Sequence, residues 1–108
     1  MLSKEALPRM SGPKLATMKF EVFGTVKGVF YRAHAFREAE RLGLVGYIKH
    51  SPKNTVIGEL QGLVPKLAIM KEWLRKRGSP DSRVEKVIFS DEQQIQTLSY
   101  EHLRIIRS

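Results

Sequence analysis

The feature that most constrains the fold is a change in the period of the apolar residues around a turn bracketed by Gly24 and Gly28. Before the turn, KFEVFGTV (residues 19–26) alternates, with Phe20 and Val22 on one face, which is typical of a half-buried strand. After the turn, apolar residues recur along one stripe of a helix: Tyr31, Ala35, Ala39 and Leu42. This part of the chain is therefore predicted to run as a strand, a tight turn and a helix.

The following segments predict two more strands, a second helix and a fourth strand. LVGYIKH (44–50) and TVIGELQG (55–62) are separated by the turn-rich SPKN, which indicates a hairpin. Pro65 opens a second helix, whose apolar stripe consists of Leu67, Met70 and Leu74. RVEKVIFS (83–90) predicts the fourth strand, and LRIIRS at the end offers a short last strand.

The order strand, helix, strand, strand, helix, strand predicts an α+β fold, the ferredoxin-like split β-α-β (βαββαβ) sandwich. In that fold an antiparallel sheet carries both helices on one face and buries a single core. Residues 1–18 contain Pro8, Gly12 and Pro13 and show no sustained period, so we expect a flexible N-terminal tail there. Residues 19–108 are then the one domain.

Composition bears on the compartment in which the chain works. The sequence has no cysteine, and it has no apolar run near the roughly 18 residues of a membrane span. Its first residues lack the apolar core of a signal peptide. We therefore expect a cytoplasmic protein without a membrane partner, a disulfide frame or a cysteine-bound metal.

The net charge of +8 favours anionic partners, namely phosphates, nucleic acid or acidic lipid. The basic residues are spread along the chain, however, so an ordinary basic surface with no polyanion partner is the favoured explanation. The predicted element order is also that of RNA-recognition domains, which stack bases on aromatic residues of a central strand. TVIGELQG contains no aromatic residue, and we expect no nucleic-acid partner.

The turn itself has the chemistry of an anion site. Glycines allow backbone N–H groups to converge, and the helix start that follows adds unpaired N–H groups and a positive dipole. Arg32, in the first helical turn, can bring a planar cation to the same space. Gly24, Gly28 and Arg32 together indicate a phosphate cradle, although the glycine spacing fits neither a P-loop nor a dinucleotide fingerprint. A tight turn beside a surface arginine is the alternative that these residues leave open.

The motifs resemble those of the acylphosphatase family, in its common or muscle type. GTVKGVFYR (24–32) matches the family signature G-x-V-x-G-V-x-x-R at every specified position, and LGLVGYIKH (42–50) is similar to a second family segment. GELQG and MKEWLRKRGSPDSRVEKVIF are similar to the family's third strand, second helix and fourth strand. The resemblance spans about residues 18–107.

The resemblance implies a metal-independent hydrolase without a cofactor, which cleaves the carboxyl–phosphate bond of acyl phosphates. The expected ligands are a small acyl phosphate, or inorganic phosphate or sulfate, and the expected state is a monomer. By position, Arg32 takes the role of the phosphate-binding arginine. The backbone N–H groups that would hold the phosphoryl oxygens then belong to the loop residues Thr25, Val26, Lys27, Gly28, Val29, Phe30 and Tyr31.

His50 departs from the family pattern, which closes the second segment with an asparagine that orients the attacking water. A neutral imidazole offers one acceptor and one donor, whereas a protonated one has no acceptor. We therefore hypothesise a phosphate site at Arg32 and His50 with weakened or pH-dependent hydrolysis. A phosphate-binding or other anion-binding relative without turnover is the alternative.

Overall fold

The computed structural model describes residues 14–26, 30–77 and 82–107. Two α-helices and six strands follow one another along these residues, and a π-helical turn extends the second helix. The elements are β1 (Leu15–Thr25), α2 (Tyr31–Arg41), β2 (Val45–His50), β3 (Val56–Leu63), α3 (Val64–Glu72), η2 (Trp73–Arg77), β4 (Arg83–Phe89), β5 (Gln93–Ile95) and β6 (Leu103–Ile106).

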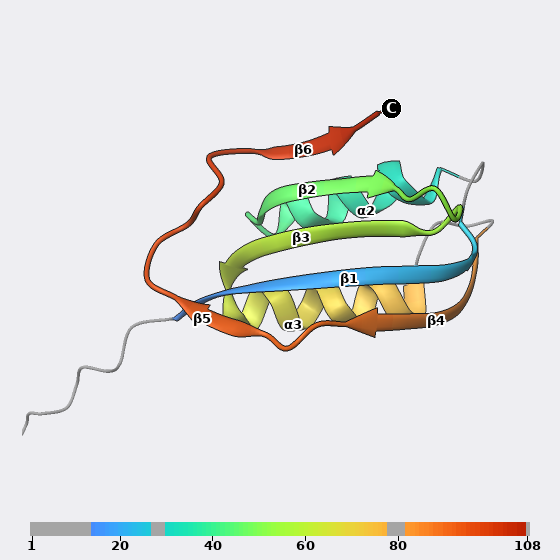
Figure 1. Cartoon of the computed structure of the whole chain (residues 1–108). Coiled ribbons are helices and arrows are strands. Elements are labelled where there is room, and N and C mark those ends of the chain that lie inside the picture. Colours follow the sequence, from blue (N-terminus) through green and yellow to red (C-terminus); the bar gives the residue numbers. More distant parts are fainter. Residues whose placement is uncertain (1–13, 27–29, 78–81, 108) are drawn as a thin grey trace, which may run out of the picture.

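The strands form one sheet in the order β4-β1-β3-β2-β6, with β5 paired to β1. The pairs β1–β3, β1–β4 and β2–β3 are antiparallel, and α2 and α3 both lie on the same face of the sheet (Figure 1). The predicted ferredoxin-like α+β sandwich is therefore confirmed. Among the described residues, no helix is long and apolar enough to cross a membrane.

The sheet differs from the antiparallel prediction at one edge. Strand β6 runs parallel to β2, with Gly46 opposite Leu103 and Lys49 opposite Ile106. The parallel pairing follows from the path of the chain after β5, which returns from the β1 side of the sheet to the β2 side before β6 starts (Figure 1). Tyr100 on this path donates a 2.7 Å hydrogen bond to Glu59 of β3 and so holds the crossing in place.

The first strand is longer than the sequence pattern predicted. It begins at Leu15, and Ala16 and Met18 are buried, so residues 15–18 of the expected tail belong to the sheet. Residues 1–13 lie outside the described part of the chain.

The core fills the space between the sheet and the two helices, and the predicted apolar stripes supply most of it. The predicted positions that are buried are Phe20, Val22, Tyr31, Ala35, Ala39, Leu42, Leu67, Met70 and Leu74, and β3 adds Val56 and Leu60. Gly43, just past the end of α2, has a φ of 73°, the left-handed conformation that commonly ends a helix. The core thereby fixes the end of β1, the start of α2 and the end of β2 relative to one another.

Candidate active site

A bulge at the end of β1 turns the chain toward the predicted phosphate loop. The register between β1 and β4 shifts between Phe23 and Gly24, and Gly24 has a φ of 133°. A Cβ at Gly24 would collide with the backbone oxygen of Arg83 on β4. Only glycine fits this position, because the bulge brings its backbone against β4, a constraint that the sequence did not reveal.

The described start of the loop is anchored in the core. Thr25 is the last residue of β1 and is exposed, whereas Val26 is fully buried. The N–H of Val26 donates a 3.1 Å hydrogen bond to the oxygen of Gly24 and is already engaged within the turn. Lys27, Gly28 and Val29, which the sequence also assigned to the cradle, lie outside the described residues.

The far side of the loop is the start of α2. Phe30 caps the helix in the left-handed conformation, with φ 58° and ψ 22°, and its ring is largely exposed. Tyr31 is fully buried, and its hydroxyl donates a 2.9 Å hydrogen bond to the oxygen of Leu74. Burial raises the pKa of this hydroxyl well above its usual range.

The N-terminus of α2 is electrostatically suited to an anion. Phe30 makes no side-chain cap hydrogen bond, and the first turn of the helix contains no acidic residue. The first N–H groups of a helix lack partners within the helix and carry the positive end of its dipole. Arg32, the second residue of α2, adds a permanent cation at the same end.

The guanidinium of Arg32 is directed toward the end of β6. Its Nη1 donates a 3.2 Å hydrogen bond to the backbone oxygen of Ile106, and the residue is half-buried. The parallel edge strand therefore orients the arginine that the sequence assigned to phosphate.

His50 is the last residue of β2, as predicted, and it is half-buried. Its Nε2 has no surface open to solvent.

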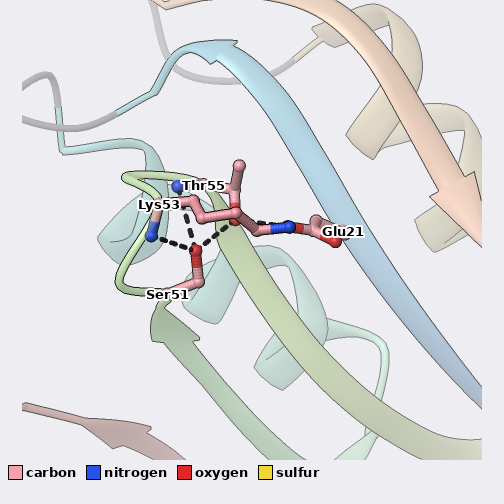
Figure 2. Close-up of polar contacts among 4 residues, drawn as sticks. All are labelled: Glu21, Ser51, Lys53 and Thr55. Carbon is pink, nitrogen blue, oxygen red and sulfur yellow. Dashed lines mark hydrogen bonds and ion pairs between the residues drawn. The ribbon is translucent and has the colours of Figure 1, made fainter.

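The turn that follows His50 is fixed by a polar cluster of Ser51, Lys53, Thr55 and Glu21 (Figure 2). Ser51 Oγ accepts hydrogen bonds from the backbone N–H groups of Lys53 (3.1 Å) and Thr55 (3.3 Å) and lies 2.5 Å from Thr55 Oγ1. Thr55 Oγ1 donates to Glu21 Oε2 at 2.7 Å. Since the Thr55 hydrogen is committed to the carboxylate, Ser51 must donate the bond between the two hydroxyls.

Two adjoining cavities open between these elements. The first, about 340 Å³, is lined by Phe30, Tyr31, Arg32, Ala33, His50, Ile105 and Arg107. The second, about 700 Å³, is lined by Arg32, Lys49, His50, Ser51, Pro52, Asn54, Ile57, Ile106 and Arg107. Arg32, His50 and Arg107 line both cavities, and none of the described residues that line either one is acidic. The site is therefore cationic.

Lys49 and Arg107 are residues of this site that sequence reasoning did not find. Arg107 follows β6, and only the parallel pairing of β6 with β2 brings it beside His50. The basic residues of the last segment, LRIIRS, could have indicated a role in anion binding. The sequence did not show, however, where this segment lies in the sheet. Within the described ranges, no group of three or more His, Cys, Asp or Glu side chains is placed to hold a metal ion.

The fold and these cavities define the class as a small ferredoxin-like α+β protein with a cationic site where a strand turns into a helix. Residues 18–102 match the family model for acylphosphatase. Acylphosphatase-1 of Homo sapiens is 42% identical over 96 residues, which cover 89% of this chain and 97% of the human protein. Acylphosphatase-2 of Rattus norvegicus is 45% identical over 91 residues, covering 84% and 94%.

The solved structures agree with the sequence matches. The structure of an acylphosphatase from Coxiella burnetii superposes with a TM-score of 0.77 at 27% identity, covering 90% of this chain and all of that one. The chain belongs to the acylphosphatase family, and the prediction of an acylphosphatase enzyme is confirmed at this level.

Proposed function

We propose that this chain hydrolyses acyl phosphates to a carboxylate and inorganic phosphate, with Arg32 and His50 as its two catalytic side chains. The observation that carries the proposal is that these residues, from α2 and β2, line the same two cavities with no carboxylate among the described lining residues. The family of the chain supports the reaction class.

The phosphoryl group would lie at the start of α2. Arg32 would bind two of its oxygens as a fork, and the helical N–H groups with those of the loop, Thr25 to Tyr31, would bind the rest. The N–H of Val26 is the exception, because it donates to Gly24. The bond from Arg32 to Ile106 supports this role, since it holds the guanidinium in one orientation before substrate arrives.

The reaction needs little from the protein beyond placement and charge. A water attacks phosphorus in line, the bond from phosphorus to the acyl oxygen breaks, and the carboxylate leaves with the electron pair. The water loses a proton, which goes to His50 or to solvent. Because a carboxylate is a good leaving group, no strong acid is required, and the cationic site stabilises the charge that develops on the phosphoryl oxygens.

His50 would position the attacking water in place of the family's asparagine. Its neutral ring can accept one hydrogen bond from the water, whereas an asparagine offers a fixed acceptor and two fixed donors. Loss of a well-placed catalytic contact commonly lowers turnover by about 100- to 1,000-fold. We therefore expect slower hydrolysis than an asparagine would give, and a further fall in acid, where imidazole becomes protonated and loses its acceptor.

The test is hydrolysis of benzoyl phosphate from pH 5 to 8, with and without a chelator. Arg32→Ala should lower kcat/KM by at least about 100-fold, and Arg37→Ala is the matched control, since Arg37 is exposed on the same helix and lines neither cavity. His50→Asn should raise kcat and remove the fall in acid. Equal rates for wild type and His50→Asn would refute the role given to His50.

The cationic lining favours one alternative, an anion-binding protein without turnover. In that case inorganic phosphate would raise the melting temperature of the wild type and not that of Arg32→Ala, while neither protein would hydrolyse benzoyl phosphate. Turnover that persists with the chelator and is lost in Arg32→Ala would support the enzyme over the anion-binding protein.

A further inference from the structure

The two cavities that meet at Arg32 and His50 differ in chemistry. The smaller one adds Tyr31, whose hydroxyl is engaged with Leu74, and the apolar residues Phe30, Ala33 and Ile105 to the shared residues. The larger one adds the polar side chains of Lys49, Ser51 and Asn54 beside the apolar Pro52, Ile57 and Ile106, so its lining is mixed and more polar. An in-line displacement places the attacking water and the leaving group on opposite sides of phosphorus. The pair of cavities offers one side suited to water and one suited to an apolar group.

Phe30 is the unusual residue of the smaller cavity. The residue is 77% exposed, the largest exposed fraction among the large apolar residues of the described chain. Its φ of 58° lies in the left-handed region, which is unfavourable for a residue with a Cβ. Strained conformations persist where the surrounding structure enforces them, and they cluster at ligand sites. An exposed aromatic ring at such a position, beside Arg32, is available to contact a ligand.

We propose that Phe30, Ala33 and Ile105 form the subsite for the acyl group, and that Phe30 makes it selective for acyl phosphates with an apolar, above all aromatic, acyl group. The inference rests on the proposed function, because it takes the phosphoryl group to be bound at Arg32. The larger, polar cavity is then left for the attacking water.

Physical chemistry gives the direction and the size of the preference. An aromatic acyl group would cover apolar surface that Phe30 now exposes to water, and the two rings could stack or meet edge to face. A pair of aromatic rings typically contributes enough to change an affinity by about two- to twelvefold. An acetyl group, with one methyl, gains almost none of this contact.

The test measures binding without turnover, using benzylphosphonate and methylphosphonate, whose P–C bonds are not hydrolysed. Calorimetry gives the ratio of the two affinities for the wild type, Phe30→Ala and the control Leu98→Ala. Leu98 is also a large exposed apolar residue and lines neither cavity. The wild type should prefer benzylphosphonate, and Phe30→Ala should reduce that preference by about two- to twelvefold. Leu98→Ala should preserve it. A loss shared by both phosphonates reports on the loop backbone and cancels in the ratio.

An unchanged ratio in Phe30→Ala would overturn the inference. A ratio that falls in Lys49→Gln and not in Phe30→Ala would overturn it too, because the ring would then lie in the larger cavity. Failure of both phosphonates to bind the wild type would count against the subsite and the proposed function together. If Phe30→Ala reduces the affinity ratio as expected but the protein does not hydrolyse benzoyl phosphate, the subsite is supported and the enzymatic function is refuted. If the protein hydrolyses benzoyl phosphate but Phe30→Ala leaves the ratio unchanged, the enzymatic function is supported and the subsite is refuted.

Discussion

The hydroxyl of Thr55 joins the turn after β2 to the neighbouring strand β1, and its removal should destabilise the protein at the edge of the site. Thr55→Val replaces the hydroxyl with a methyl group of similar shape. The change removes the bond to Glu21 Oε2 and leaves Ser51 Oγ beside an apolar group. Nothing else in the shape of the side chain changes, so the effect reports on the polar cluster.

The size of the effect follows from the burial of the two partners. Thr55 is 5% exposed and the side chain of Glu21 is 25% exposed, so water reaches the carboxylate only in part. A hydrogen bond to a charged group contributes about 1.5–3 kcal/mol, and partial exposure of Glu21 favours the lower half of that range. We expect the free energy of unfolding to fall by about 2 kcal/mol. For a domain of this size that corresponds to a melting temperature lower by about 8–16 °C.

The assay is urea unfolding at neutral pH, followed by far-UV circular dichroism. Thr97→Val serves as the matched control because Thr97 is exposed. Since the turn follows His50 directly, Thr55→Val should also lower kcat for benzoyl phosphate with little change in KM. A loss of less than about 0.5 kcal/mol, equal to that of the control, would refute the reasoning. It would mean that water replaces the cluster at no cost.

Three further predictions concern tyrosine hydroxyls and the strained helix start. Tyr31→Phe should lower the free energy of unfolding by about 1–3 kcal/mol in urea, because it leaves the oxygen of Leu74 without its buried donor; an unchanged urea midpoint would contradict this. Phe30→Gly should raise the free energy of unfolding by about 0.5–1 kcal/mol, since relief of about 1–2 kcal/mol of left-handed strain outweighs glycine's unfolded entropy; a lower melting temperature would count against it. The bond from Tyr100 to Glu59 raises the pKa of that phenol to about 12, so its contribution to stability is complete below pH 10 and is lost between pH 10 and 12. Urea midpoints from pH 8 to 11.5 should fall more steeply for the wild type than for Tyr100→Phe.

Most of the fold could be predicted from the sequence because each helix and strand has its own local pattern of apolar residues. The alternation of Phe20 and Val22 and the stripe from Tyr31 to Leu42 each reflect one element packing one face on the core, and the structure buries all of these positions. The position and direction of strand β6 in the sheet could not be predicted from the sequence. Its four residues contain a strand pattern, but the pattern does not state which edge it pairs with or in which direction.

The candidate site shows the same difference between residues that are close in the sequence and residues brought together by strand pairing. Gly24, Gly28 and Arg32 lie within one strand–turn–helix segment of the sequence, so an anion site could be proposed from their spacing, whereas Phe30 was named only through the family resemblance. Arg107 and the oxygen of Ile106 reach the site only through the pairing of β6 with β2. Sequence reasoning therefore named the groups that we propose to hold a phosphate, and it missed the residues that complete the cavity and orient Arg32.

The proposed phosphate-binding groups and the proposed water-binding group come from different parts of the fold, and this affects how the site would gain or lose catalysis. The proposed phosphate-binding groups belong to a local unit that contains a bulge glycine, a buried valine and a buried tyrosine, and only the Arg32 guanidinium also takes its orientation from β6, through Ile106. The proposed water-binding group, His50, comes from a different strand and is supported by the Ser51–Thr55–Glu21 cluster. Because the two parts are held by different contacts, a change at position 50 can alter turnover while phosphate affinity stays the same. A binding protein and an enzyme on this fold would then differ at one residue, which makes kcat, measured separately from phosphate affinity, the quantity that tells them apart.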